Sequence, residues 1–168
     1  EASHNLISAL ELLYRAYDQN LEADKLKAQI EYNRESKYSE ADKLNSTRSI
    51  IDVSSKKITA NINDASQVLS DIGRGYYEQS LPYAYSATQN AILLAMTIKN
   101  TAEKSSKGTE SLLQNLGEVV GFFTILKDLP QFAKDMQSTS KLIFGGAKAK
   151  KIRDKGNHGK ALEELNLN

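Results

Sequence analysis

Apolar residues recur every three or four positions along most of this chain. The longest regular series contains Leu44, Ile51, Ile58, Ile62, Ala65, Leu69, Ile72 and Tyr76. Such a/d spacing places successive side chains on one helix face and is typical of coiled-coil-like contacts. The alternation typical of strands is not sustained anywhere, and the chain has only two prolines. The sequence therefore predicts an all-α fold.

A chain of 168 residues has the size of a single domain. The periodic segments predict an elongated bundle of four to five helices, over residues 5–33, 39–76, 82–105, 109–126 and 128–156. Pro82 fits the first turn of a helix that follows a turn at Ser80-Leu81. Gly145-Gly146 should kink or weaken the last helix. We expect residues 1–156 to form the bundle and residues 157–168 to be a frayed tail.

The first two predicted helices are the longest and should form a long N-terminal hairpin. The third helix spans only about 35 Å at 1.5 Å per residue, so it cannot reach the turn of that hairpin. The stretch from Asp24 to Arg48 is also the most polar in the chain. The hairpin tip should therefore protrude, which makes Arg34 and Lys37 candidate contacts for a protein partner. The alternative is that the first helix breaks near Asn33 and the tip folds back.

The segment from Leu116 to Leu126 is the longest nearly apolar run, interrupted by Glu118. It is too short to span a bilayer, which takes about 20 residues. We expect it to be buried in the bundle, with Leu116, Val120 and Phe123 in the core. A membrane-active protein would instead expose this face.

The sequence offers no catalytic, cofactor or metal site. There is no cysteine, and the two histidines, His4 and His158, lie near opposite termini. Zinc and di-iron sites require more ligands than these. Two Ser-x-x-Lys matches, at Ser54 and Ser138, lack the companion motifs of the penicillin-recognising enzymes. The carboxylates lie in polar stretches and should be solvated, so we expect no enzyme activity.

Four tyrosines surround the predicted turn before Pro82: Tyr76, Tyr77, Tyr83 and Tyr85. Tyrosine is enriched at protein interfaces, so this cluster is a candidate interaction surface. The alternative, which we favour, is that the rings plug the end of the bundle with their hydroxyls in water.

The basic residues are concentrated near the C-terminus, although the net charge of the chain is only +1. Between residues 141 and 160 there are seven Lys and Arg against one Asp. The candidate contacts for an anionic surface are Lys148, Lys150, Lys151, Arg153 and Lys155. This segment contains no aromatic residue for base stacking, so nucleic acid is not the expected partner.

These features favour a non-enzymatic helical scaffold that binds another protein through the hairpin tip or the tyrosine cluster. The alternative is a helical protein that binds a membrane surface or an anionic ligand through residues 148–155. A homo-oligomer is compatible with either hypothesis. The chain begins at Glu1 and not at Met, which leaves room for a preceding signal or lipid-anchor segment. Export to the periplasm or the medium is therefore slightly favoured over the cytoplasm.

Overall fold

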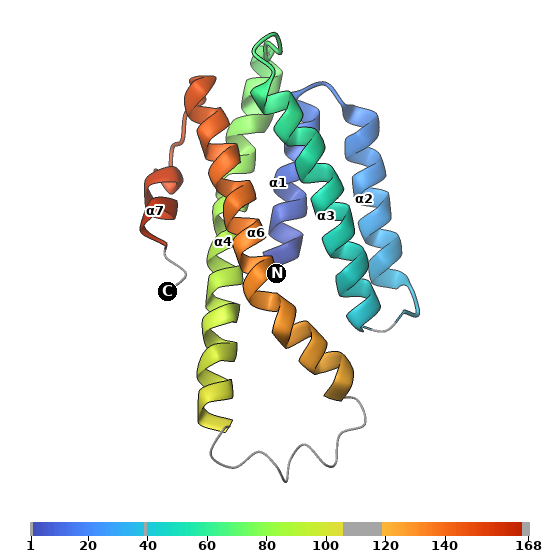
Figure 1. The fold of residues 1–168 in the computed structure, drawn as a ribbon. Helices are drawn as coiled ribbons and strands as arrows, with labels where there is room; N and C mark the ends of the chain where they lie inside the picture. The colour runs from blue at the N-terminus through green and yellow to red at the C-terminus, as the bar shows by residue number, and fades with distance from the viewer. Residues whose placement is uncertain (1, 39, 106–118, 166–168) are drawn as a thin grey trace.

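The computed structural model describes the backbone of residues 2–38, 40–105 and 119–165, and side chains at 2–38, 42–43, 45–97 and 131–165. All regular structure within these residues is helical, which confirms the predicted all-α bundle (Figure 1). The helices are α1 (Ala2–Ala16), α2 (Asn20–Glu35), α3 (Glu40–Asn63), α4 (Asp71–Ser105), α6 (Val119–Ala149) and α7 (His158–Glu164).

Helix α1 lies at the centre of the bundle, where it contacts α2, α3 and α4. The buried stripe of Leu6, Leu10 and Leu13 is fully covered by these neighbours. Helix α6 packs against α3 and α4, and the short α7 lies outside α4 and α6. Successive helices from α1 to α6 alternate in direction, as Figure 1 shows.

The predicted helix over residues 5–33 is wrong, because the chain reverses at Tyr17–Gln19. Asp18 adopts a left-handed conformation, with φ of 58°, which Asp tolerates better than most residues. The Gln19 N–H donates to the carbonyl of Tyr14 at 2.8 Å and closes the turn. The N-terminal hairpin is therefore formed by α1 and α2, and the break does not fall near Asn33, as the alternative supposed.

The apolar series from Leu44 to Tyr76 also does not lie on one helix. Helix α3 ends at Asn63, and α4 starts at Asp71. Two polar side chains fix the connection: Asp64 accepts hydrogen bonds from Ser66, and the hydroxyl of Ser70 accepts one from Gly73 N–H at 3.0 Å. Ser70 thereby caps the first turn of α4. Ile51 and Ile58 face the core as predicted, but Ile72 is 74% exposed.

Two predicted turns at prolines lie within continuous helices. Pro82 lies inside α4, where it removes one backbone donor. The helix continues through Pro82 because Tyr77, Leu81 and Ala84 are buried. Of the described helices, α4 packs most extensively on α1. Helix α6 likewise runs through residues 128–130, and it passes the double glycine without ending. The predicted helix over 109–126 lies mostly outside the described residues, as do the side chains of Leu116, Val120 and Phe123.

The C-terminal segment contains α7, which packs on the bundle. Leu162 is 1% exposed, and the Gln137 side chain donates to the carbonyl of Leu165 at 2.7 Å. Residues 157–165 therefore belong to the folded domain and do not form the frayed tail that the sequence predicted.

Candidate interaction sites

The turn between α2 and α3 is anchored by a buried asparagine. Asn33 is only 5% exposed, and its amide donates to the carbonyl of Lys43 at 2.9 Å and to the hydroxyl of Thr47 at 2.7 Å. On the α2 side, the Ser36 N–H donates to the carbonyl of Tyr32, and the Ser36 hydroxyl donates to the carbonyl of Asn33. The bonds of Asn33 hold the end of α2 against α3, and those of Ser36 close the last turn of α2.

The side chains around this anchor point to solvent. Tyr32 is 68% exposed and Tyr38 is 55% exposed, and a hydrogen bond with Tyr32 raises the pKa of Tyr38. Arg34 and Lys37, which the sequence placed at the tip, are also exposed. We call Tyr32, Arg34, Lys37 and Tyr38 the tip cluster. Its two tyrosines were not among the residues predicted from the sequence, although both flank the polar turn that was.

The four tyrosines of α4 do not form a common surface. Tyr77 is fully buried, and its hydroxyl donates to the carbonyl of Ile143 at 2.8 Å. Tyr76 is partly buried against the core, whereas Tyr83 is 43% exposed. The ring of Tyr85 contacts His158, with centroids 5.4 Å apart. The expected inter-helix turn is absent here, so these residues neither line one interface nor plug the end of the bundle together.

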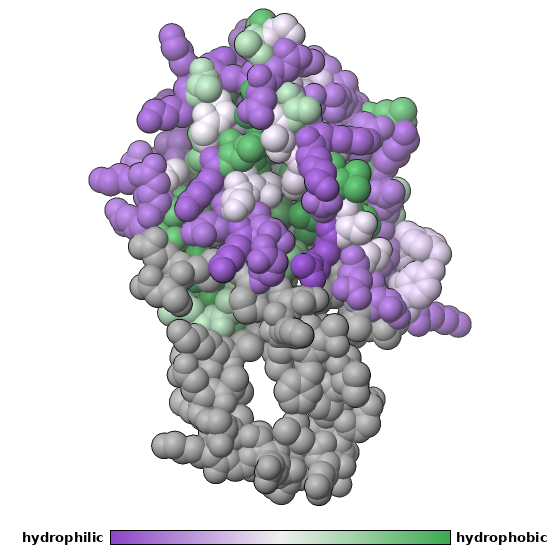
Figure 2. Space-filling model, in the orientation of Figure 1, coloured by the Kyte–Doolittle hydropathy of each residue, from purple (hydrophilic) through white to green (hydrophobic). Residues whose placement is uncertain are grey.

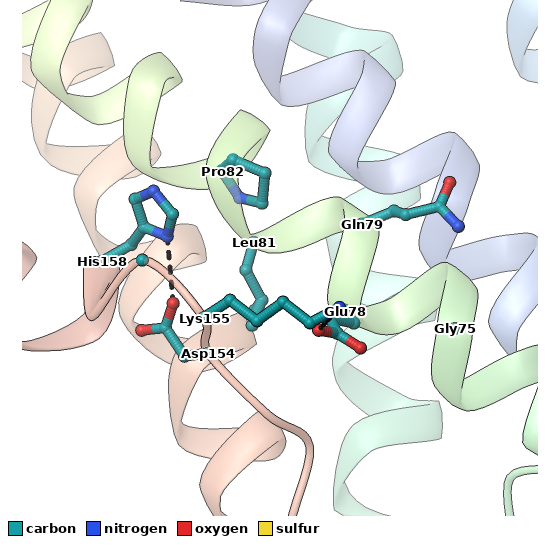
Figure 3. Close-up of a pocket in the computed structure, with 9 residues that line it drawn as sticks. Gly75, Glu78, Gln79, Leu81, Pro82, Asp154, Lys155 and His158 are labelled. Carbon is teal, nitrogen blue, oxygen red and sulfur yellow. Dashed lines mark hydrogen bonds and ion pairs between the residues drawn. The ribbon is translucent and has the colours of Figure 1, made fainter.

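A cavity of about 440 Å³ lies between α4 and the connection from α6 to α7 (Figure 3). Lys155 forms an ion pair with Glu78 at 2.7 Å across it, and Asp154 Oδ1 lies 3.0 Å from His158 Nδ1. Asp154 also accepts the Gly159 N–H at 2.8 Å. Burial acts to raise the pKa of Asp154, but the hydrogen bonds from Gly159 and His158 outweigh it and lower this pKa.

This Asp–His pair fixes the first turn of α7. The described residues that line the cavity include no serine, threonine or cysteine that His158 would activate. The arrangement therefore explains how the connection is held, and this lining offers His158 no hydroxyl or thiol to activate as a nucleophile. The side chains that the structure describes also contain no group of three His, Asp or Glu suited to a metal ion.

The basic segment is divided between internal contacts and solvent. Arg74 donates to the carbonyls of Lys150 and Lys151 at 3.1 and 2.8 Å. The Lys150 ammonium binds the carbonyl of Gln67 at 2.9 Å and lies over the ring of Tyr17. Gly145-Gly146 was expected to weaken the last helix, but the segment that follows these glycines is held against the bundle by these contacts.

Three of the five candidate anion contacts remain available. Lys148, Lys151 and Arg153 are exposed, and the charged groups of their side chains have no polar partner among the residues that the structure describes. Lys150 and Lys155, in contrast, are engaged by Gln67 and Glu78.

The described part of the face in Figure 2 is mostly hydrophilic, with apolar residues in separate small groups. None of the described helices is long and apolar enough to cross a membrane. Comparisons with models of protein families, with curated proteins and with solved structures found no match.

Proposed function

We propose that this protein is a non-enzymatic helical module that binds another protein through the tip cluster. The observation that carries the proposal is the pair of exposed tyrosines, Tyr32 and Tyr38, on a turn anchored by the buried Asn33. Tyrosine and arginine are enriched at the energetic centres of protein interfaces. Arg34 supplies the guanidinium, with 76% of its side chain exposed.

The anchoring of the turn supports the same proposal. An interface side chain that is already positioned loses less conformational entropy on binding than a side chain on a loose loop. Asn33 and Ser36 hold the backbone on both sides of Arg34 through hydrogen bonds of 2.7 to 2.9 Å. The backbone that carries Tyr32 and Arg34 is therefore fixed by these bonds.

The test replaces both tip tyrosines, as Tyr32→Ala with Tyr38→Ala, and measures affinity for a partner captured by a photo-crosslinker at position 37. Truncation of interface centres typically costs about 2 kcal/mol or more, so the affinity should fall about thirtyfold. Tyr83→Ala is the matched control, because Tyr83 is an exposed tyrosine on another helix, and it should bind as the wild type does. Equal affinity of the tip variant and the control, or no protein crosslinked at position 37, would refute the proposal.

A second candidate function is contact with an anionic membrane surface through Lys148, Lys151 and Arg153. It is favoured by two exposed aliphatic side chains next to this segment: Val68 is 89% exposed and Ile72 is 74% exposed. The hydrogen bond from Lys150 to Gln67 joins the two regions. Basic residues near aliphatic ones are typical of proteins that lie on membrane surfaces.

Vesicle binding separates the second candidate from the first. Each exposed basic residue near an anionic surface contributes about 1 kcal/mol, and this attraction weakens as salt screens it. The triple variant Lys148→Gln, Lys151→Gln, Arg153→Gln should then lose binding to anionic vesicles, whereas the tip variant should retain it. Binding that is equal on neutral vesicles, or unchanged in the triple variant, would exclude this function.

A further inference from the structure

A groove of about 580 Å³ runs between α6 and α7, on a different part of the molecule from the tip cluster. Its floor is apolar and consists of Phe144, Ala147, Ile152 and Leu162. Three of these residues are at most 9% exposed, and Phe144 is partly buried against the core. The volume lies in the range typical of small-molecule sites, about 300–1,000 Å³.

Three lysines line this groove: Lys141 and Lys148 from α6, and Lys160 from α7. Lys141 and Lys148 are seven positions apart, so they lie on one face of α6. All three side chains are exposed, and none has an ion-pair or hydrogen-bond partner among the described residues. An apolar floor is therefore lined from both helices by unpaired cations.

The two acids of the groove do not cancel this charge. Asp154 is bound by the Gly159 N–H and by His158, at 2.8 and 3.0 Å. Glu163 is exposed on α7 and is the other acidic residue of the lining. The groove therefore has an excess of positive charge beside an apolar surface.

Gly145 lies between the two lysines of α6 and keeps the groove open. A Cβ at this position would meet no atom within 4 Å. The residues 141, 145 and 148 follow the spacing of one helix stripe. A side chain at position 145 would consequently project into the groove without displacing its walls.

We propose that this groove binds a free single-chain anionic amphiphile, such as a medium-chain carboxylate. The alkyl chain lies on Phe144, Ile152 and Leu162, where its burial supplies the hydrophobic contribution. The carboxylate lies among Lys141, Lys148 and Lys160, which offer charge-assisted hydrogen bonds. A neutral alkyl chain lacks the charged contacts with the lysines, and a short anion lacks the hydrophobic contribution of a buried chain.

The test follows amide chemical shifts during titration with decanoate, 1-decanol and acetate, each kept in the monomeric range. Decanoate should shift Gly145, Gly159 and their neighbours, with an affinity at least about tenfold above that of decanol, as expected for one good charged contact. Acetate should cause no saturable shift. Equal affinity for decanoate and decanol, saturable acetate binding, shifts confined to another region, or a response only to anionic vesicles would each overturn the proposal.

Two variants address the groove directly. Gly145→Leu should fill it and weaken decanoate binding by about tenfold or more, the usual effect of blocking an apolar pocket. The triple variant Lys141→Gln, Lys148→Gln, Lys160→Gln should weaken decanoate binding to the level of decanol.

The controls are Ala28→Leu, an added side chain on the exposed face of α2, and Lys134→Gln, an exposed lysine of α6 outside the groove. If the triple variant binds decanoate like the wild type, the proposal is wrong, whatever the folding of Gly145→Leu. The tip cluster is not involved, so this result is independent of protein binding there.

Discussion

Two buried tyrosines in mutual contact, Tyr17 and Tyr77, differ in how their hydroxyls are satisfied. Their rings meet edge to face, with centroids 6.3 Å apart. The Tyr77 hydroxyl donates to the carbonyl of Ile143, whereas the buried Tyr17 hydroxyl has no hydrogen-bond partner among the described residues. A buried polar group without a partner costs free energy, while a satisfied one contributes modestly to stability.

The two Tyr→Phe substitutions should therefore have different effects on stability. Tyr77→Phe removes a buried hydrogen bond and should lower the free energy of unfolding by about 1 kcal/mol. Tyr17→Phe removes only the unsatisfied hydroxyl, so stability should stay the same or rise. Urea denaturation of both variants measures the difference. A loss in Tyr17→Phe as large as that in Tyr77→Phe would show that the Tyr17 hydroxyl has a partner.

The same burial predicts loss of stability in alkaline solution. Burial raises the pKa of Tyr17 to about 12 and also raises that of Tyr77. A raised pKa means that folding favours the protonated phenol, so this contribution is complete below the unfolded-state pKa of about 10. It is lost as the pH rises from about 10 toward the folded-state value. Urea denaturation between pH 8 and 11 should show this decline, and Tyr17→Phe should make it shallower.

Sequence reasoning identified the aromatic residues of α4 but not their roles. Tyr77 binds a carbonyl 66 positions away, and Tyr85 contacts His158. Such long-range partners leave no trace in local spacing. Arg34 and Lys37 were found because the polarity of their segment does predict exposure, and the same argument applied to Tyr32 and Tyr38 would have completed the tip cluster.

At the level of helices, the adjacent residues Gly145 and Gly146 have the same intrinsic helix propensity but different surroundings. A Cβ on Gly146 would collide with the Tyr77 hydroxyl and with Ile62, whereas a Cβ on Gly145 would meet open space. Gly146 is therefore required for the close approach of α6 to α3 and α4. The packing of α6 on α3 and α4 does not require glycine at position 145, where glycine lowers helix propensity.

Replacement of each glycine by alanine should change stability in opposite directions. Gly145→Ala should raise the free energy of unfolding by up to about 1 kcal/mol, because alanine favours the helix. Gly146→Ala should lower it by about 1–3 kcal/mol, the usual range for overpacking. Thermal or urea denaturation of the two variants measures both effects. A stabilising Gly146→Ala would mean that Tyr77 and Ile62 move aside at little cost.

The breaks between helices were the least predictable feature of the fold. Apolar periodicity correctly indicates helix on both sides of Asp18 and of the 64–70 connection, since each side must bury a face. The breaks themselves depend on single polar residues, namely Asp18, Asp64 and Ser70. Because Asp and Ser occur at many positions of this chain, their presence does not mark a break. Conversely, Pro82 suggested a turn, but burial of its helical neighbours Leu81 and Ala84 outweighs one lost backbone hydrogen bond.

At the level of the whole molecule, the helices differ in how many neighbours hold them. Helix α1 packs extensively on α4 and also contacts α2 and α3, whereas α7 packs mainly on α4 and α6 with far fewer contacts. The two helices nevertheless bury leucines to a similar degree: Leu10 is 0% exposed and Leu162 is 1% exposed. Burial of the individual residue thus does not distinguish a central helix from a peripheral one.

The position of the helix, central or peripheral, should determine how replacement of such a leucine by alanine affects stability. Leu10→Ala removes contacts that the whole bundle shares, so it should lower the free energy of global unfolding by about 2–5 kcal/mol. Leu162→Ala should mainly destabilise the docking of α7, which can detach while the remaining helices stay folded. Hydrogen exchange should therefore accelerate throughout α1 and α4 in the first variant, but only in α7 and the 150–157 connection in the second. If Leu162→Ala also accelerates exchange in α1, then α7 unfolds together with the bundle and the domain is a single cooperative unit up to Leu165.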